Sequence, residues 1–566
     1  MKRGSFFLSC ALFAFLFGGL QPAFAEKSLS PSPKPPVPQT GRVVLIGGGE
    51  EDPEIARTLV EMAGGSQAKV AIFPVGSPAS GAAVGLAYQR FFSNFNCKQV
   101  DSVAVAERAD ASELGVVRAI AESDLLYFPS GNPYGIWSVL NDTALHGGIQ
   151  AAWQRGAVIA GSGAGAVIWG SRMITKGTSD RAVMSGETLG NDGQPGFELK
   201  KGLELLEHQV FDTSFVKENR IGRMLLALGR TPDASGIGID TQTAAVIGAE
   251  SIKALGKGTV SLFETSFVEI NNAKLVNRLL PLALSGVQMS VIHPGDVYDR
   301  KKKKIDFSSE LPPRAFRGKA KPYLLAIGSS LPIDLPSIRD FLRVCGGNQS
   351  SILILSGEAA QENAKKWQSF LLLLGASQAN VLGATDFSDE GMAVNLQKAT
   401  GIFLLDDGSG TLANALNAQK GRFGLYVYEY ADRLPVAAAG KGVRLLGEAF
   451  IPEPLAQGAT SGLKLLPGYV FENNVWGHNS LNRLFTGLFE SGRATGFGLN
   501  AFNSLTVTGG AATVVGKSPV LCLDADAVTG FKLSEAAEHP PTFSNLTIDV
   551  IPPLAVFDLD KHAPRY

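Results

Sequence analysis

The stretch GAVIAGSGAGAVIWG, at residues 156–170, decides the fold of this chain. It joins an apolar run to a turn of very small residues and then to a second apolar run. This order predicts a buried strand that passes through a tight turn into a helix. Two interpretations of the turn stay open at this point. It is either a nucleophile elbow, which needs a Ser or Cys at its apex, or a tight turn whose glycines serve packing or the approach of a phosphate.

Short apolar runs alternate with helical patterns around this stretch. The alternation predicts an α/β fold with parallel-rich sheets, and such sheets carry their sites at the carboxyl ends of the strands. The loops at that edge are 47–49, 130–132 and 161–165. The predicted strands are 43–46, 69–73, 125–128 and 157–160, and the predicted helices are 54–62, 113–121 and 144–153.

The chain contains the same domain twice, because segments of its first half recur in the same order in its second half. Chance would give one such pair but not the whole series. The clearest pairs are VVLIGGG (43–49) with LLAIGSS (324–330), GLELLEHQVFD (202–212) with GLKLLPGYVFE (462–472), GIGID (236–240) with GFGLN (496–500), and VIHPGDVYD (291–299) with VIPPLAVFD (550–558).

The domain organisation follows from this duplication together with the composition of the joining segments. A basic run and a pair of prolines separate the repeats, and we expect a solvated linker there. The predicted organisation is a signal peptide (1–25), a proline-rich tether (26–41), repeat 1 (42–299), a basic, proline-containing linker (300–320) and repeat 2 (321–560).

Length and composition fit a globular protein of several domains. The 566 residues are 45% hydrophobic and 18% charged, and 51 basic against 52 acidic residues give a formal net charge of -1. Without a field of one sign, nucleic acid is not an expected partner. Cys97, Cys345 and Cys522, which follow the predicted signal peptide, are too sparse for a disulfide framework and have no metal-ligand spacing. We expect no metal and no cofactor.

The amino-terminal segment has the pattern of a secretory signal peptide. Lys2 and Arg3 precede an apolar run at 6–20, and Ala23 and Ala25 provide small residues for cleavage after Ala25. The sequence therefore predicts export to the periplasm or the medium. No later segment is long and apolar enough to predict a membrane span after the signal is removed.

Five motifs of repeat 1 resemble a known family of enzymes. The chain is similar to the cyanophycinase and aspartyl dipeptidase family of serine peptidases, and the likeness covers nearly all of repeat 1. The resemblance implies two tandem flavodoxin-like, three-layer domains related to class I glutamine amidotransferases. The motifs are VLIGGGEE (44–51), PSGNP (129–133), VIAGSGAGA (158–166), DTSFVKENRIGRM (212–224) and GIGIDTQTA (236–244).

The same resemblance puts catalysis in doubt. It places Gly163 at the position of the nucleophilic serine, Ser214 at that of the catalytic histidine and Thr241 at that of a glutamate. A serine peptidase needs the nucleophile and its base together, so we expect a non-catalytic binding or structural module. The alternative is an active peptidase, acting on aspartyl-arginine or related peptides, with Ser162 as a relocated nucleophile. Ser162 would lack a base, and His208 lies near the start of its strand.

The backbone of the turn and two arginines remain as candidates for ligand binding. The resemblance implies an acidic or arginine-containing peptide as the ligand, and backbone N–H groups at the turn are suited to a carboxylate. The arginines are equally consistent with ion pairs or a helix surface. The candidate binding residues are Gly131, Asn132, Gly161, Ser162, Gly163, Ala164, Asp212, Arg220 and Arg223.

Repeat 2 departs further from the family pattern. Gly440 corresponds to Gly163, and the offset between the repeats falls from 277 there to 260 at residue 202, so 17 residues are missing. The loop at 406–410 is consistent with a cation-binding loop or with an ordinary turn. Because members of the family form homodimers, the resemblance also implies that the two repeats pack as an intramolecular pseudo-dimer.

Overall fold

The computed structural model describes residues 41–75, 81–186, 196–277, 279–307, 311–455, 459–477, 480–534 and 539–566. The predicted signal peptide, and the predicted tether up to residue 40, lie outside these ranges. Among the described residues, no helix has the length and apolar character needed to cross a bilayer.

The first sheet of repeat 1 is built around the predicted strands. Its members are β1 (Arg42–Ile46), β2 (Lys69–Ile72), β3 (Gln99–Ser102), β4 (Leu125–Phe128), β5 (Val158–Ser162), β10 (Thr243–Ile247), β11 (Ser251–Gly256), β15 (Val297–Asp299) and β16 (Lys304–Ile305). The order is β16-β15-β11-β10-β1-β5-β4-β2-β3. Strands β1 to β5 run parallel, which confirms the predicted parallel core, and the other four add an antiparallel extension.

Repeat 2 contains a sheet of the same plan. Its members are β17 (Tyr323–Ile327), β18 (Ser351–Ser356), β19 (Gln378–Gly383), β20 (Gly401–Leu405), β21 (Val436–Ala439), β26 (Asn503–Thr508), β27 (Ala511–Gly516), β31 (Val556–Asp558) and β32 (Ala563–Arg565). The order β19-β18-β20-β21-β17-β26-β27-β31-β32 matches that of repeat 1, strand for strand. The sheet reaches beyond the predicted end of repeat 2 at residue 560, and β16 lies inside the predicted linker.

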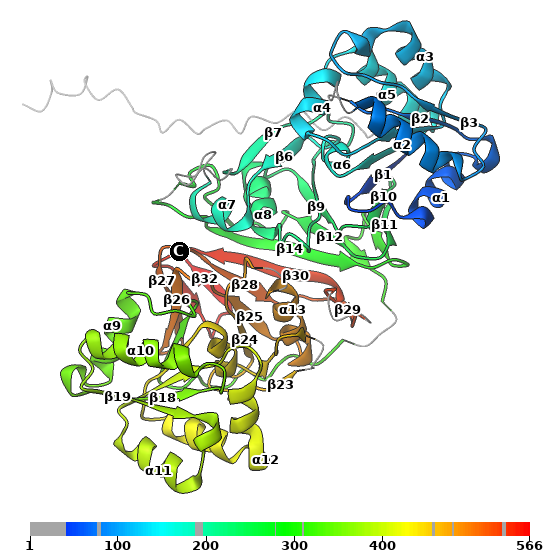
Figure 1. Ribbon diagram of the computed structural model, residues 1–566. Helices are drawn as coiled ribbons and strands as arrows, with labels where there is room; N and C mark the ends of the chain where they lie inside the picture. The colour runs from blue at the N-terminus through cyan, green and yellow to red at the C-terminus, as the bar shows by residue number, and fades with distance from the viewer. Residues whose placement is uncertain are drawn as a thin grey trace, which may run out of the picture. The chain divides into compact units, whose positions relative to one another are not determined.

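A second sheet draws strands from both repeats. From repeat 1 come β6 (Arg172–Lys176), β7 (Glu198–Lys201), β8 (Gln209–Thr213), β9 (Ser235–Ile239), β12 (Val260–Glu264), β13 (Ile270–Asn271) and β14 (Leu284–Ile292). From repeat 2 come β24 (Tyr469–Glu472), β25 (Thr495–Gly498), β28 (Val520–Asp524), β29 (Gly530–Lys532) and β30 (Thr542–Ile551). The main path is β24-β25-β28-β30-β14-β12-β9-β8-β6-β7, so β14 and β30 join the repeats (Figure 1).

The pairing of β14 with β30 has the register of a two-fold axis. Gln288 lies opposite Thr547, its counterpart at an offset of 259, and its Nε2 donates to Thr547 Oγ1 at 3.0 Å. On either side, Val287 lies opposite Ile548 and Met289 opposite Leu546. Each strand therefore presents equivalent positions to its copy, as in an isologous interface.

Helices cover the sheets on both faces. In repeat 1 they are α1 (Pro53–Met62), α2 (Gly81–Ser93), α3 (Leu114–Glu122), α4 (Pro133–Leu140), α5 (Ala144–Arg155), α6 (Ala164–Val167), α7 (Ser179–Ser185) and α8 (Ile221–Arg230). In repeat 2 they are α9 (Pro336–Val344), α10 (Gln361–Leu373), α11 (Asp389–Lys398), α12 (Thr411–Tyr430) and α13 (Ser480–Glu490). The three predicted helices are confirmed as α1, α3 and α5, with ends that differ by one or two residues.

Alternation along β1 explains the layers of repeat 1. Val44 and Ile46 pack with α1 and α2 on one face, whereas Val43 and Leu45 pack with α3, α5 and the second sheet on the other. A third core follows the shared sheet and includes apolar residues of α8 and α13 together with both joining strands. The repeats therefore bury part of their apolar surface against each other.

The missing residues of repeat 2 fall beside its turn. The short 3-10 helix η5 (Gly440–Leu446) stands where repeat 1 has α6, and where repeat 1 has β6, α7 and β7 the described part of repeat 2 has only a separate pair, β22 (Ala449–Phe450) and β23 (Thr460–Ser461). The shared sheet therefore ends earlier on the side of repeat 2.

A buried carboxyl group lies at the joint between the repeats. Asp549 is 4% exposed, and the backbone N–H of Gly286 donates to its Oδ1 at 2.9 Å. Burial raises the pKa of Asp549 from 3.8 to about 6, against the opposing effect of hydrogen bonds from Ser285 and Gly286.

This raised pKa predicts a pH-dependent stability. Between about pH 4 and 6 the folded chain holds a proton that the unfolded chain has released, so this contribution to stability is lost as the pH rises through about 6. Asn cannot ionise. We therefore expect the free energy of unfolding of Asp549→Asn, relative to that of the parent protein, to increase by about 2–3 kcal/mol as the pH is raised from about 4 to 7.5. Urea unfolding at both pH values measures this difference. Asp306→Asn, at an exposed site, is the control, and a gain independent of pH would contradict the prediction.

Candidate functional site

The glycine-rich stretch forms a tight turn between β5 and α6. Gly163 has φ 53° and ψ -115°, a conformation that residues with a Cβ rarely adopt. A Cβ on Gly161 would lie 2.0 Å from the carbonyl oxygen of Gly165. The backbone therefore has the shape of a nucleophile elbow, and glycine is needed to make it.

Three further loops meet at this turn. Gly163 donates its N–H to Ile46 O at 2.9 Å, and Ser214 donates to Gly47 O at 3.0 Å. Gln242 donates to Gly48 O at 2.9 Å. The predicted site edge, at the carboxyl ends of the parallel strands, is thus assembled as the sequence indicated.

Ser130 occupies the space in front of the elbow. A Cβ atom on Gly163 would lie 2.4 Å from Ser130 Oγ and 3.0 Å from Ser130 Cβ. The same hydroxyl accepts a hydrogen bond from the backbone N–H of Ala164 at 3.3 Å. In a nucleophile elbow, the N–H that follows the nucleophile belongs to the oxyanion hole. Sequence reasoning assigned no role to Ser130, because 34 residues separate it from Ala164.

Ser214 and Thr241 lie close to the elbow through the first glycine loop. Ser214 has φ 51°, and its Oγ donates to Gly47 O at 3.3 Å. Thr241 lies beside Gly49, because a Cβ added to Gly49 would be 3.3 Å from the Cβ of Thr241. His208 directly precedes β8, which confirms its predicted place at the start of that strand, and so it lies at the opposite edge of the sheet.

Ser162 is held in a buried polar cluster. It is 1% exposed, and its Oγ donates to Glu51 Oε1 at 3.3 Å. Tyr88 and Tyr127 donate to the same carboxylate at 2.5 and 3.2 Å. Burial, followed by the charge of Glu51, raises the pKa of both tyrosines. Glu51 belongs to the first quoted motif, but its contact with Ser162 spans 111 residues and has no local signal.

Asp212 and the two candidate arginines form a buried ion pair network. Asp212 is fully buried at the end of β8 and accepts from Arg223 Nε at 2.6 Å and from Arg223 Nη2. Arg220 Nη1 donates to Asp212 Oδ1 at 3.2 Å and to Thr213 O at 2.6 Å. Arg223 Nη1 also donates to Gly177 O at 2.8 Å. All three guanidinium nitrogens of Arg223 and the Nη1 of Arg220 are thus hydrogen bonded within the protein.

Gly131 and Asn132 are exposed in the loop between β4 and α4. Asn132 caps α4, because its Oδ1 accepts from the backbone N–H of Gly135 at 3.0 Å. The side chain of Asn132 therefore has a structural role as the N-cap of this helix. Within the described ranges, no group of three or more His, Cys, Asp or Glu side chains is arranged to hold a metal ion.

Comparison with known proteins assigns the family. The model of peptidase family S51 matches residues 43–255. The cyanophycinase of Geminocystis herdmanii is 30% identical over 268 residues, which cover 46% of this chain and 93% of that protein. The cyanophycinase of Synechococcus elongatus is 27% identical over 278 residues, covering 48% and 83%. The chain belongs to the cyanophycinase and S51 peptidase family.

Among solved structures, a peptidase from an acI-B1 Actinobacterium is similar, with a TM-score of 0.34 and 19% identity, covering 46% of this chain and 97% of that chain. The family assignment agrees with the resemblance found in the motifs of repeat 1. The strand order gives each repeat a parallel core, as expected for the flavodoxin-like fold, and each core carries an antiparallel extension.

Repeat 2 of this S51 family member retains the shape of the turn. Gly440 has φ 55°, close to the value at Gly163. The loop at 406–410 is organised by its own first residue, because Asp406 accepts from the backbone N–H groups of Gly408, Gly410 and Leu412 at 2.7, 3.2 and 3.0 Å. These contacts favour the ordinary turn over the cation-binding loop.

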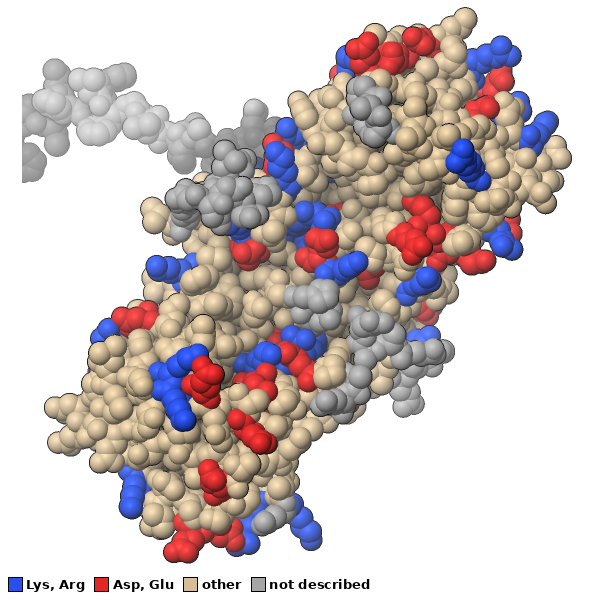
Figure 2. Space-filling model, viewed as in Figure 1, with Lys and Arg blue, Asp and Glu red and all other residues tan. Residues whose placement is uncertain are grey.

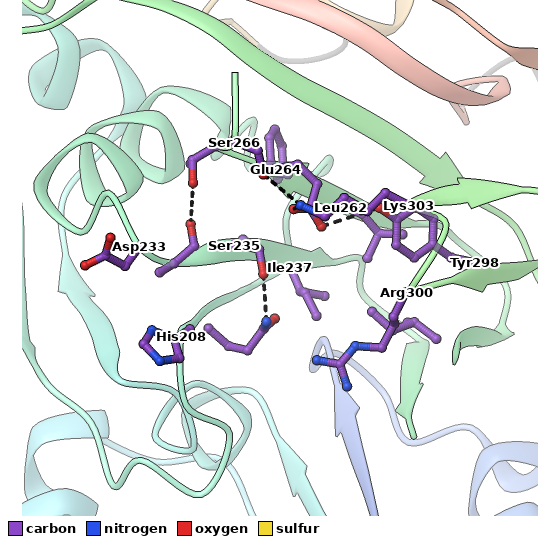
Figure 3. Close-up of a pocket in the computed structure, with 16 residues that line it drawn as sticks. His208, Asp233, Ser235, Ile237, Leu262, Glu264, Ser266, Tyr298, Arg300 and Lys303 are labelled. Atoms are coloured by element: carbon purple, nitrogen blue, oxygen red, sulfur yellow. Dashed lines mark hydrogen bonds and ion pairs between the residues drawn. The ribbon is translucent and has the colours of Figure 1, made fainter. Parts of the chain in front are cut away.

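A separate cavity of about 290 Å³ lies at the opposite edge of the shared sheet, at the first residues of β8 and β9 (Figure 3). Lys303 Nζ lies 2.8 Å from Glu264 Oε2 and 2.7 Å from Ser266 Oγ. Gln209 Nε2 donates to Ser235 Oγ at 2.6 Å. These polar side chains of the cavity wall therefore form hydrogen bonds and an ion pair with one another.

The buried network predicts a large loss of stability on its disruption. Asp212→Asn would leave Arg220 and Arg223 without their buried counter-charge, and we expect a loss of about 3–5 kcal/mol in the free energy of unfolding. Glu218 contacts Arg220 at 3.6 Å but is 56% exposed, so Glu218→Gln should cost less than about 1 kcal/mol. Urea unfolding measures both. Similar small losses for the two variants would show that the network is not structural.

Proposed function

We propose that this chain is a non-catalytic member of the S51 peptidase family that acts as a binding or structural module. The observation that carries the proposal is the elbow of repeat 1. Gly163 offers no nucleophile at the apex, and Ser130 Oγ lies where the side chain of a nucleophile would begin. The elbow backbone is therefore kept, but a nucleophile at its apex would require Ser130 to move.

The groups around the elbow support this proposal. A serine nucleophile needs a base within hydrogen-bond reach, and Ser214 holds only a hydroxyl, which donates to Gly47 O. The N–H of Ala164, which would stabilise an oxyanion, donates to Ser130. Loss of such a unit lowers kcat on the order of 10⁶-fold in a serine peptidase.

The alternative is an active peptidase that uses Ser162. Glu51 does supply a carboxylate within reach of its hydroxyl, which sequence reasoning had not found. However, Ser162 is 1% exposed, belongs to β5 and shares Glu51 with two tyrosines. A substrate carbonyl has no access to a hydroxyl in that position, so the geometry favours the non-catalytic function.

The proposed ligand at the elbow of repeat 1 is an acidic or arginine-containing peptide. Because Arg220 and Arg223 are tied to Asp212, the exposed loop around Asn132 and the backbone of the elbow are the groups left for such contacts. On the face drawn in Figure 2, acidic and basic side chains are interspersed, which suits local recognition better than long-range attraction. The basic, apolar and small-residue pattern of residues 1–25 supports export of this module.

We further propose that the two repeats form an intramolecular pseudo-dimer. The two-fold register of β14 and β30 and their common apolar core support it. Asn219 of repeat 1 adds polar contacts, because its Nδ2 donates to Val475 O at 2.7 Å and to Gly477 O at 2.9 Å in repeat 2.

A fluorophosphonate probe tests the absence of catalysis. We expect the folded chain of residues 26–566 to remain unlabelled, because no described hydroxyl at the elbow has a base and access together. It should release no product from aspartyl-arginine dipeptides, while an active serine peptidase in the same assay is labelled. Labelling that disappears in Ser162→Ala or Ser130→Ala would overturn the proposal and identify the nucleophile.

Separate expression of the repeats tests the pseudo-dimer. Residues 42–307 and 311–566 each leave one joining strand unpaired, so we expect the two pieces to bind each other when mixed. Analytical ultracentrifugation measures the complex. Two folded pieces that sediment as unassociated monomers would contradict the proposal.

A further inference from the structure

Repeat 2 has a cavity of about 620 Å³ at the edge that corresponds to the elbow site of repeat 1. It lies where β17, β21 and β24 end, and its lining carries several groups that donate hydrogen bonds. Ser330 and Asn474 are exposed in it, and Lys441 is 33% exposed. In repeat 1, Ala164 and Ser214 stand at the positions of Lys441 and Asn474.

Three basic side chains share two carboxylates beneath and beside this cavity. Arg444 contacts both Glu453 and Glu472 at 2.7 Å, and Arg483 contacts both at 3.3 Å. Lys441 pairs with Glu453. Burial would raise the pKa of Glu453, but hydrogen bonds from Arg444 and Lys441 and the charge of Arg483 lower it to about 2. The carboxylate stays ionised and the cluster keeps one excess positive charge.

The excess charge is located at the cavity. Arg444 and Glu472 are both 1% exposed and balance each other in the interior. The charged groups that line the cavity are Lys441, Arg483 and Glu453. Asp406, in the neighbouring loop, does not line it and uses its oxygens on three backbone N–H groups.

Asn473 provides a second sign of an incomplete site. This residue lines the cavity and is only 5% exposed, yet its Oδ1 has no hydrogen-bond partner in the described structure. A buried acceptor of this kind is costly unless a donor reaches it. The Oδ1 atom is itself buried, so a hydroxyl or ammonium group of a ligand becomes such a donor when the Asn473 amide turns toward the cavity.

We propose that this cavity of repeat 2 binds a small carboxylate that also bears a hydroxyl or ammonium group. Lys441, Ser330 and Asn474 hold the carboxylate, and Asn473 accepts a hydrogen bond from the second group. The described residues of repeat 2 include no counterpart of α7, which in repeat 1 packs against α8. In repeat 1, Ser179 of α7 is hydrogen bonded to Gly222 at the start of α8, at 2.9 Å.

This proposal is independent of the one for repeat 1. It uses residues that repeat 1 lacks, and it stands whether or not the elbow at Gly163 is inert. Binding is measured without any assay of hydrolysis, so the two proposals fail separately.

Isothermal titration calorimetry on the whole chain, with L-malate and L-aspartate as probes, tests the site. We expect at least one of them to bind, and argininamide, a cation without a carboxylate, to give no binding. Lys441→Ala removes a charge-assisted hydrogen bond and should weaken binding about tenfold or more. Its fold should persist, because Glu453 keeps Arg444 and Arg483.

Two further variants control the experiment. Ala501 is exposed and lines the cavity, so Ala501→Trp obstructs it without removing a charge, and binding should be lost. Lys366→Ala removes a lysine of α10 that is 53% exposed and should bind as the parent does. The proposal is overturned if neither carboxylate binds at millimolar concentration, if Lys441→Ala binds as tightly as the parent, or if argininamide binds instead.

Discussion

The joining strands β14 and β30 set the condition on which the rest of the structure depends. A strand of nine residues, buried along most of its length, cannot leave its outer backbone N–H and C=O groups unpaired without cost. In this chain each joining strand meets that requirement with its own copy, around Gln288 and Thr547. Because α8 and α13 pack on the same shared sheet, the helices beside both elbows depend on the joint as well.

The buried carboxylates next to the elbows show how this dependence reaches the candidate sites. Asp212 and Glu472 lie at the ends of β8 and β24, at an offset of 260, and each binds an arginine from the first turn of the following helix. The arginines are Arg223 and Arg483, also at an offset of 260. The two repeats thus keep an equivalent strand-to-helix ion pair although the residues around it differ. Such a pair has a structural role that does not require catalysis.

The sequence predicted the local part of the fold well, and the long-range part poorly. Apolar runs indicated four strands of repeat 1, because strands buried on both faces have few polar residues, and the repeats indicated two similar domains. Nothing local indicates that Gln288 pairs with Thr547, since the repeat shows that a strand is copied but not that the copies meet. The motifs predicted which residues occupy the three family positions, Gly163, Ser214 and Thr241. They did not predict which residues lie against them.

Ser130 and Glu51 illustrate the limit for the site itself. Each lies in a motif quoted from the sequence, yet each accepts a hydrogen bond from a residue far along the chain, Ala164 and Ser162 respectively. Which face of β5 a hydroxyl occupies depends on strand register, and the alternation of the strand places Ser162 on the side of α1 and α2. Gly163 therefore lies at the apex of the turn, whereas the side chain of Ser162, one residue earlier, lies in the buried polar cluster with Glu51.

The glycines of the elbow also take on a different meaning. Their persistence in the sequence suggested that a pocket is retained for a ligand. However, a Cβ on Gly165 would lie 2.2 Å from Phe128 O, and one on Gly440 would lie 2.4 Å from Ser330 Oγ. Gly165 is therefore needed for the close passage of the strand into its helix, with or without a nucleophile, and Gly440 is needed because Ser330 lies against it. Evidence for a ligand has to come from groups that folding leaves unsatisfied, and at the cavity of repeat 2 such a group is Asn473 Oδ1 rather than any of the glycines.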